Sequence, residues 1–201
     1  MRMRRHRYRL NRSIGALTMT GLLALAGGLA NVATTIAGPS PQIQWVNYMD
    51  LVPGDPSDTT AVTLEHPSFG TNTLGLVITS SSLGDLDSNN ENKVVTMALE
   101  LPKQVKVTGV RICYENSNPG PNGTFIEQTR LAQLNNTDGS TALVLLDDAT
   151  HLDASGPTCA TSSSVKPAIN GSAGSVILSF RIKTANVLDQ IVIHSVGLLV
   201  K

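Results

Sequence analysis

Beyond residue 40, apolar and polar residues alternate in short runs along most of the chain. The run over Ser175–Lys183 is the clearest example, because Val176, Leu178, Phe180 and Ile182 occupy one face while Ser179, Arg181 and Lys183 occupy the other. A period of two is the pattern of a half-buried β-strand. Similar runs, interrupted by Gly, Pro, Asn, Asp and Ser, predict about nine strands: 41–48, 59–65, 74–79, 93–101, 105–114, 124–134, 141–146, 175–183 and 190–200.

Two of these runs depart from a simple alternation. In the run over 105–114 the apolar parity changes around Thr108 and Gly109, which predicts a β-bulge. The run over 124–134 has some helical spacing, but its flanks are rich in Asn, Gly and Pro and favour a strand.

Many short strands without a convincing helix predict an all-β fold, a two-sheet antiparallel β-sandwich. We expect a jelly roll, with an immunoglobulin-like sandwich as the alternative. The immunoglobulin pattern places a tryptophan between two cysteines, whereas Trp45 precedes both Cys113 and Cys159. Residues 38–201 are expected to form a single domain.

The first 37 residues have the layout of a cleaved secretory signal peptide. Six arginines lie within residues 1–12, an apolar stretch covers 14–37, and no charged residue follows Arg12 until Asp50. Ala30, Ala33 and Ala37 are candidate cleavage positions. An uncleaved anchor is the alternative, because the apolar stretch is long enough to span a bilayer. The protein is therefore expected to be secreted, periplasmic or at the cell surface, with no membrane insertion after cleavage.

Removing this leader changes the charge balance. The remaining chain carries nine Lys and Arg against fifteen Asp and Glu, a net charge of about −6. A mildly acidic domain lacks the basic surface that nucleic acids require, so we expect no nucleic-acid partner.

The two cysteines are expected to form a disulfide. An even cysteine count in an exported chain favours a bridge, and no Cys or His lies within four residues of either to suggest a metal site. Cys159 lies within the long connector 147–174, so a bond to Cys113 would hold that connector against the strand 105–114. Because Cys113 has the opposite parity to Ile112 and Tyr114, it should face away from their side.

The connector 80–92 alternates acidic and amide side chains, at Asp85, Asp87, Asn89 and Glu91. These are oxygen donors of the kind that calcium prefers. Asn90 and Thr96 occupy the positions where an EF-hand loop has its glycine and its bidentate glutamate, so a solvated turn is the preferred interpretation and calcium the alternative. No other cofactor is indicated.

No catalytic motif accompanies the three histidines beyond the leader, and an enzyme is not expected. The adjacent acids Asp147 and Asp148 could serve a small glycan hydrolase or lyase, but neighbouring strand residues point apart, so a turn explains them better. Among few aromatic residues, Trp45, Tyr48 and Phe69 lie at strand ends or in connectors and could form a sugar-stacking surface.

The sequence thus supports three functions, in descending order. The first is an exported, non-enzymatic β-sandwich acting as a structural or interaction module at the cell surface or in the extracellular space. The second is a carbohydrate-binding module, with or without calcium; the third is the small hydrolase or lyase. The partner is a protein or a glycan that the sequence does not identify.

Overall fold

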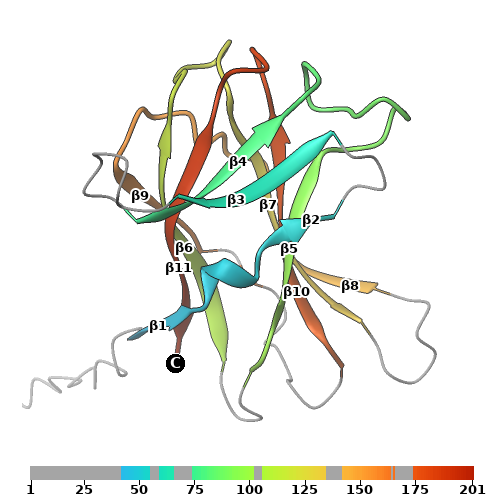
Figure 1. The fold of residues 1–201 in the computed structure, drawn as a ribbon. Coiled ribbons are helices and arrows are strands. Elements are labelled where there is room, and N and C mark those ends of the chain that lie inside the picture. The colour runs from blue at the N-terminus through green and yellow to red at the C-terminus, as the bar shows by residue number, and fades with distance from the viewer. Residues whose placement is uncertain are drawn as a thin grey trace, which may run out of the picture. The chain divides into compact units, whose positions relative to one another are not determined.

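Two antiparallel β-sheets pack face to face in this protein (Figure 1). The computed structural model describes residues 42–54, 59–65, 74–101, 106–134, 142–163, 165 and 174–201. The first sheet contains β3 (Thr60–Glu65), β4 (Gly75–Ser80), β11 (Ile191–Val200), β6 (Val107–Asn116) and β9 (Thr158–Ser162), with β1 (Gln42–Val46) also paired to β11. The second contains β2 (Val52–Pro53), β5 (Val94–Leu99), β10 (Val176–Lys183), β7 (Phe125–Leu134) and β8 (Ala142–Asp148).

The order of the strands is that of a jelly roll. From β4 to β11 the chain alternates between the sheets, except at the β7–β8 hairpin, so that β4-β11-β6-β9 faces β5-β10-β7-β8. All strand pairs are antiparallel. The predicted all-β sandwich is therefore confirmed, in its jelly-roll form.

The core lies between the sheets and is built from the inward positions of the alternating strands. In β10, Val176, Leu178, Phe180 and Ile182 are all at most 1% exposed, as the sequence pattern predicts. The segment 124–134, for which the sequence favoured a strand over a helix, forms β7.

The predicted bulge is present in β6. Leu199 of β11 pairs with Gly109, and the next residue, Val200, pairs with Val107, so Thr108 is the extra residue. The bulge changes which side of the strand faces inward and lets both Val107 and Val110 reach the core. Gly109 is required here, because a Cβ would stand 2.4 Å from the carbonyl oxygen of Ser162 in β9.

Two strands were not predicted from the sequence, namely β2 and β9. The segment of β9 has no large aliphatic residue and was assigned to the 147–174 connector, yet it pairs with β6 from Val110 to Tyr114. Its strand conformation follows from this pairing rather than from burial of its own side chains.

Cys113 and Cys159 are directly opposite each other in this β6–β9 pair and are joined by a disulfide, with their Cα atoms 4.0 Å apart. The pairing agrees with the sequence prediction. Cys113 is half-buried while the flanking Ile112 and Tyr114 are buried, so the bridge lies on the outer face of the sheet.

All described residues belong to a compact unit, Ala37–Lys201. The predicted signal peptide lies outside the described residues. Among the residues that the structure describes, no helix is long and apolar enough to cross a membrane.

Candidate functional site

The most exposed aromatic side chain of the described core strands is Trp45 in β1. Its side chain is 55% exposed, and the neighbouring outward residue Ile43 is 42% exposed. β1 adds to the edge of the first sheet by pairing with β11, which places Trp45 opposite Gly197. A large apolar ring therefore stands on the solvent side of this sheet.

Gly197 gives the indole a place to rest. A Cβ at residue 197 would stand 3.0 and 3.2 Å from the Cε3 and Cζ3 atoms of Trp45, and 2.7 Å from Cγ2 of Ile43. The glycine is itself buried, although it faces outward, because these two side chains cover it. The ring is thus packed against the sheet on one side and open to solvent on the other.

Polar side chains continue the same row across the sheet. Gly197 pairs with Arg111 of β6, and Arg111 pairs with Thr161 of β9. The Arg111 guanidinium donates a hydrogen bond to Oγ1 of Thr161, with 3.3 Å between Nη1 and Oγ1. Since neighbouring strands are about 4.8 Å apart, the guanidinium group is within reach of any ligand that stacks on Trp45 and extends across the strands.

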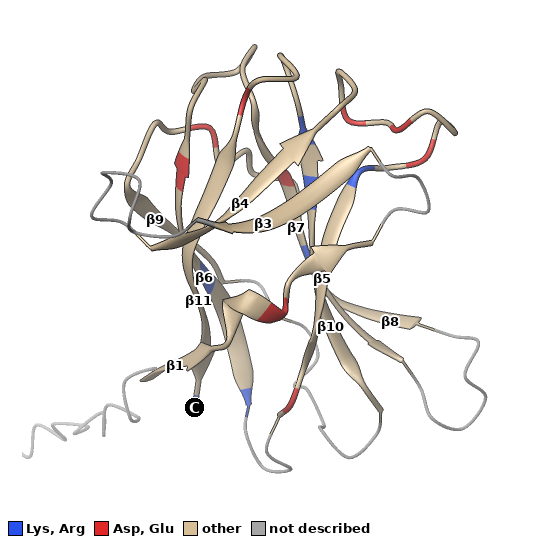
Figure 2. Ribbon diagram, in the orientation of Figure 1, with Lys and Arg blue, Asp and Glu red and all other residues tan. Residues whose placement is uncertain are grey.

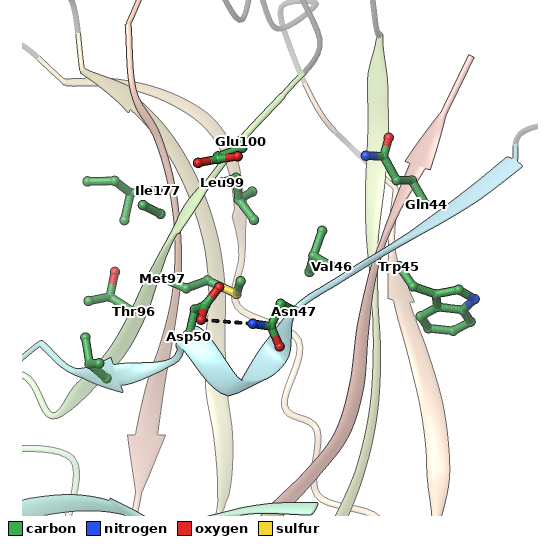
Figure 3. Close-up of a pocket in the computed structure, with 12 residues that line it drawn as sticks. Gln44, Trp45, Val46, Asn47, Asp50, Thr96, Met97, Leu99, Glu100 and Ile177 are labelled. Atoms are coloured by element: carbon green, nitrogen blue, oxygen red, sulfur yellow. Dashed lines mark hydrogen bonds between the residues drawn. The ribbon is translucent and has the colours of Figure 1, made fainter.

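The other side of β1 faces a groove of about 740 Å³. One wall is formed by β1 and η1 (Tyr48–Asp50), and the other by β5 (Figure 3). The lining combines apolar and polar side chains: Gln44, Val46, Asn47, Asp50, Val52, Thr96, Met97, Ala98, Leu99, Glu100 and Ile177, with Trp45 also contributing. Figure 3 shows the indole of Trp45 pointing away from Met97 and Asp50, so the ring and the groove are two separate surfaces.

The other two predicted aromatic residues do not extend the Trp45 surface. Tyr48 is partly buried and packs against the core. Phe69 lies outside the described residues. Within the described part of the chain, the stacking surface therefore rests on one ring.

The acidic connector between β4 and β5 is occupied by protein partners (Figure 2). Asp85 forms an ion pair with Arg181 of β10, which also contacts Glu127 at 3.1 Å. Oδ1 of Asp87 accepts hydrogen bonds from the backbone N–H groups of Asn89 and Glu91, at 2.7 and 2.8 Å. These contacts form a turn that the aspartate closes. In the part of the chain that the structure describes, no cluster of three or more His, Cys, Asp or Glu side chains could hold a metal ion.

Asp147 and Asp148, at the end of β8, have different partners. Asp147 forms an ion pair with Arg130 at 3.1 Å and also accepts a hydrogen bond from Gln128. Burial would raise the pKa of the Asp148 carboxyl, but hydrogen bonds from Ser162 and Thr150 outweigh it and lower the pKa below its ordinary value. Ser162 belongs to β9, so Asp148 links the two sheets along one open side of the sandwich.

Two histidines are described and they lie apart from these surfaces. The ring of His151 packs against Phe125 with centroids 4.5 Å apart. His194 sits at a bulge in β11 and contacts Glu115, with 3.4 Å between Nε2 and the carboxylate. His66 lies outside the described residues.

The sequence identified Trp45 but not its surroundings. Gly197 and Arg111 are about 150 and 65 residues away in the chain and join Trp45 only through strand register. A glycine within a strand is the one sequence signal that points to a close approach at this position.

Comparisons with known proteins assign no function to the chain. No protein-family model matches it, and no curated protein is significantly similar to it in sequence. A search of solved structures finds a xylan-binding domain, CBM22-1 from Paenibacillus barcinonensis Xyn10C, with a TM-score of 0.47 and 7% identity over 82% of this chain and 97% of that chain. It also finds the CBM22-1-GH10 modules of a Clostridium thermocellum endo-1,4-beta-D-xylanase, with a TM-score of 0.45 and 14% identity over 80% of this chain and 28% of that chain.

A third similar structure is the enzymatically active domain of bacteriophage CBA120 tailspike protein 4. Its TM-score is 0.45, with 15% identity over 76% of this chain and 20% of that chain. Values of this size do not transfer a ligand or an activity.

Proposed function

We propose that this protein is an exported, non-catalytic module that binds a glycan on the outer face of its first sheet, with Trp45 as the stacking residue. The observation that carries the proposal is the state of the indole, which is 55% exposed yet packed against Gly197. A ring that is already held in place loses little conformational freedom when a ligand covers it.

The chemistry beside the ring suits a sugar better than a purely apolar ligand. A pyranose ring has an apolar face of C–H groups and an edge of hydroxyl groups. The indole offers an apolar surface for the first, and Arg111 and Thr161 offer hydrogen-bonding groups for the second. Export is supported by the predicted leader and by the Cys113–Cys159 disulfide, which is typical of oxidising compartments.

The test is binding to a glycan array, followed by titration with each soluble polysaccharide that binds. Xylan belongs in the panel because it is the ligand named for the similar xylan-binding domains. We expect W45A to raise the Kd by about tenfold or more, equivalent to about 1.4 kcal/mol, without a change in melting temperature.

The matched control is L188A. Leu188 is 83% exposed in the connector between β10 and β11, so its truncation also removes exposed apolar surface but should leave the Kd unchanged. Equal binding by wild type and W45A would overturn the proposal. So would a folded protein that binds no glycan, in which case the structural or interaction module becomes the better description.

A further inference from the structure

The lower half of β5 is paired on one side only, among the residues that the structure describes. β10 pairs with the whole strand, Val94–Leu99, whereas β2 pairs with Val95 and Thr96 and goes no further. The N–H of Gly54 donates to the carbonyl of Val94 at 2.7 Å, so the backbone groups of Val94 face the β2 side. In an antiparallel ladder every second residue faces the same side, and the N–H and C=O of Ala98 therefore face away from β10.

These backbone groups open into the groove between β1 and β5. The groove is lined on the same stretch by Met97 and Leu99, which are 3% and 7% exposed, and by Val46 from the opposite wall (Figure 3). An unpaired strand edge beside an apolar lining is a site to which an extended chain can add by main-chain hydrogen bonding.

We propose that this groove accepts the N-terminal segment 31–37 of a second copy of the protein, which adds to β5 as a further strand. The segment reads NVATTIA, and four of its seven residues are β-branched. Val32, Thr34 and Ile36 are two residues apart, so they share one face of a strand and would lie over Met97 and Leu99.

Charge is consistent with this occupant. The groove lining includes two carboxylates, Asp50 and Glu100, and no Lys or Arg. No acidic residue occurs between Arg12 and Asp50, so the segment brings no like charge to the groove.

The connection to β1 favours a neighbouring copy over the same chain. Only Gly38–Pro41 separate the segment from Gln42, where β1 begins. The residue before a proline favours extended backbone, so Pro39 and Pro41 disfavour a reversal within these four residues. Each copy then offers one segment and one groove, which is a head-to-tail contact that builds chains or rings.

The experiment uses the exported protein, with its N-terminus sequenced and its assembly measured by sedimentation over a range of concentrations. We expect a chain beginning at Asn31 that forms oligomers, and we expect an excess of a synthetic 31–37 peptide to dissociate them. A98P should be monomeric, since proline removes the N–H that faces the groove and leaves the β10 side of the ladder intact. A98T keeps the N–H and is the matched control, which should still assemble.

Should A98P fail to fold, I36D tests the same contact from the segment, outside the folded sandwich, and should also be monomeric. A mature chain that begins at Gly38, one that begins at Asn31 but stays monomeric, or oligomers that persist in I36D would each overturn the proposal. W45A should assemble normally, because the indole faces away from the groove, and this separates failure of the assembly from failure of glycan binding.

Discussion

The carboxylates of the β4–β5 connector show how single side chains decide between a turn and a metal site. Asp85 is paired with Arg181, and Asp87 closes a turn through two backbone N–H groups. Lys93, which is fully buried, donates from Nζ to the carbonyl oxygen of Gly84 at 3.0 Å. The connector thus keeps its shape through contacts within the protein.

We therefore expect EDTA to have little effect on stability. Because Asp85 and Asp87 already have protein partners, removal of divalent cations should shift the melting temperature by less than roughly 2 °C, which is under about 1 kcal/mol for a domain of this size. Thermal unfolding with added calcium and with EDTA measures this. A difference of many degrees would establish the calcium alternative and support a calcium-assisted glycan site.

Asp148 provides a pH-dependent contribution to stability. Its pKa is lowered in the folded protein, because hydrogen bonds from Ser162 and Thr150 outweigh the effect of burial. The unfolded chain, with an aspartate pKa of about 3.9, then binds this proton more readily than the folded protein does. The stabilisation is present above that value and is lost as the pH falls through the lowered pKa of the folded state.

D148N should therefore be less stable than the wild type near pH 6, and the gap should close as the pH falls below about 3. Urea unfolding of both proteins from pH 6 to pH 2.5 gives the two free energies. D147N is a control, since Asp147 lies on the outer face in an exposed ion pair with Arg130, and pairs of that kind contribute little. A gap between wild type and D148N that is independent of pH would contradict this account.

At the level of elements, β9 depends most on a single covalent contact. It is an edge strand of five residues, joined to β6 by backbone pairing and by the Cys113–Cys159 bond. The two cysteines are 46 residues apart, so their bond closes a loop that includes β7, β8 and the connector to β9.

Replacing both cysteines with serine should destabilise the protein by about 4 kcal/mol, the loop-closure entropy of a ring of this size. The melting temperature should fall by roughly 8–16 °C, and limited proteolysis should cut first near β9. Circular dichroism of the variant should still report a β-protein, because the other strand pairs remain. Two free thiols in protein taken from an oxidising compartment would contradict the bond itself.

For the whole molecule, the central expectation is export and removal of the leader. The leader layout predicts a mature N-terminus between Asn31 and Gly38, because each candidate cleavage position follows a small residue in that range. N-terminal sequencing of protein from a secreting host measures this directly. Retention of Met1 or Arg2 on the exported protein would favour the uncleaved anchor.

The strand pattern could be predicted well because it depends on local physics. Inward residues such as Phe180 must alternate with solvent-facing ones, and a change of parity at Thr108 can only be absorbed by a bulge. The sequence also carried the Cys113–Cys159 pairing, since two cysteines allow a single intramolecular bond. These features need no knowledge of which strands are neighbours.

Tertiary structure decided what depends on neighbours far away in the chain. β9 has no apolar pattern and becomes a strand because β6 pairs with it. Trp45 is a stacking surface, and Tyr48 part of the packed interior, because register places Gly197 beneath the indole while Tyr48 turns toward the core. The groove beside β5 exists because β2 ends where the pairing could have continued. The physical reason is that alternation determines which face of a strand is buried, whereas pairing between distant strands determines what each exposed residue stands beside.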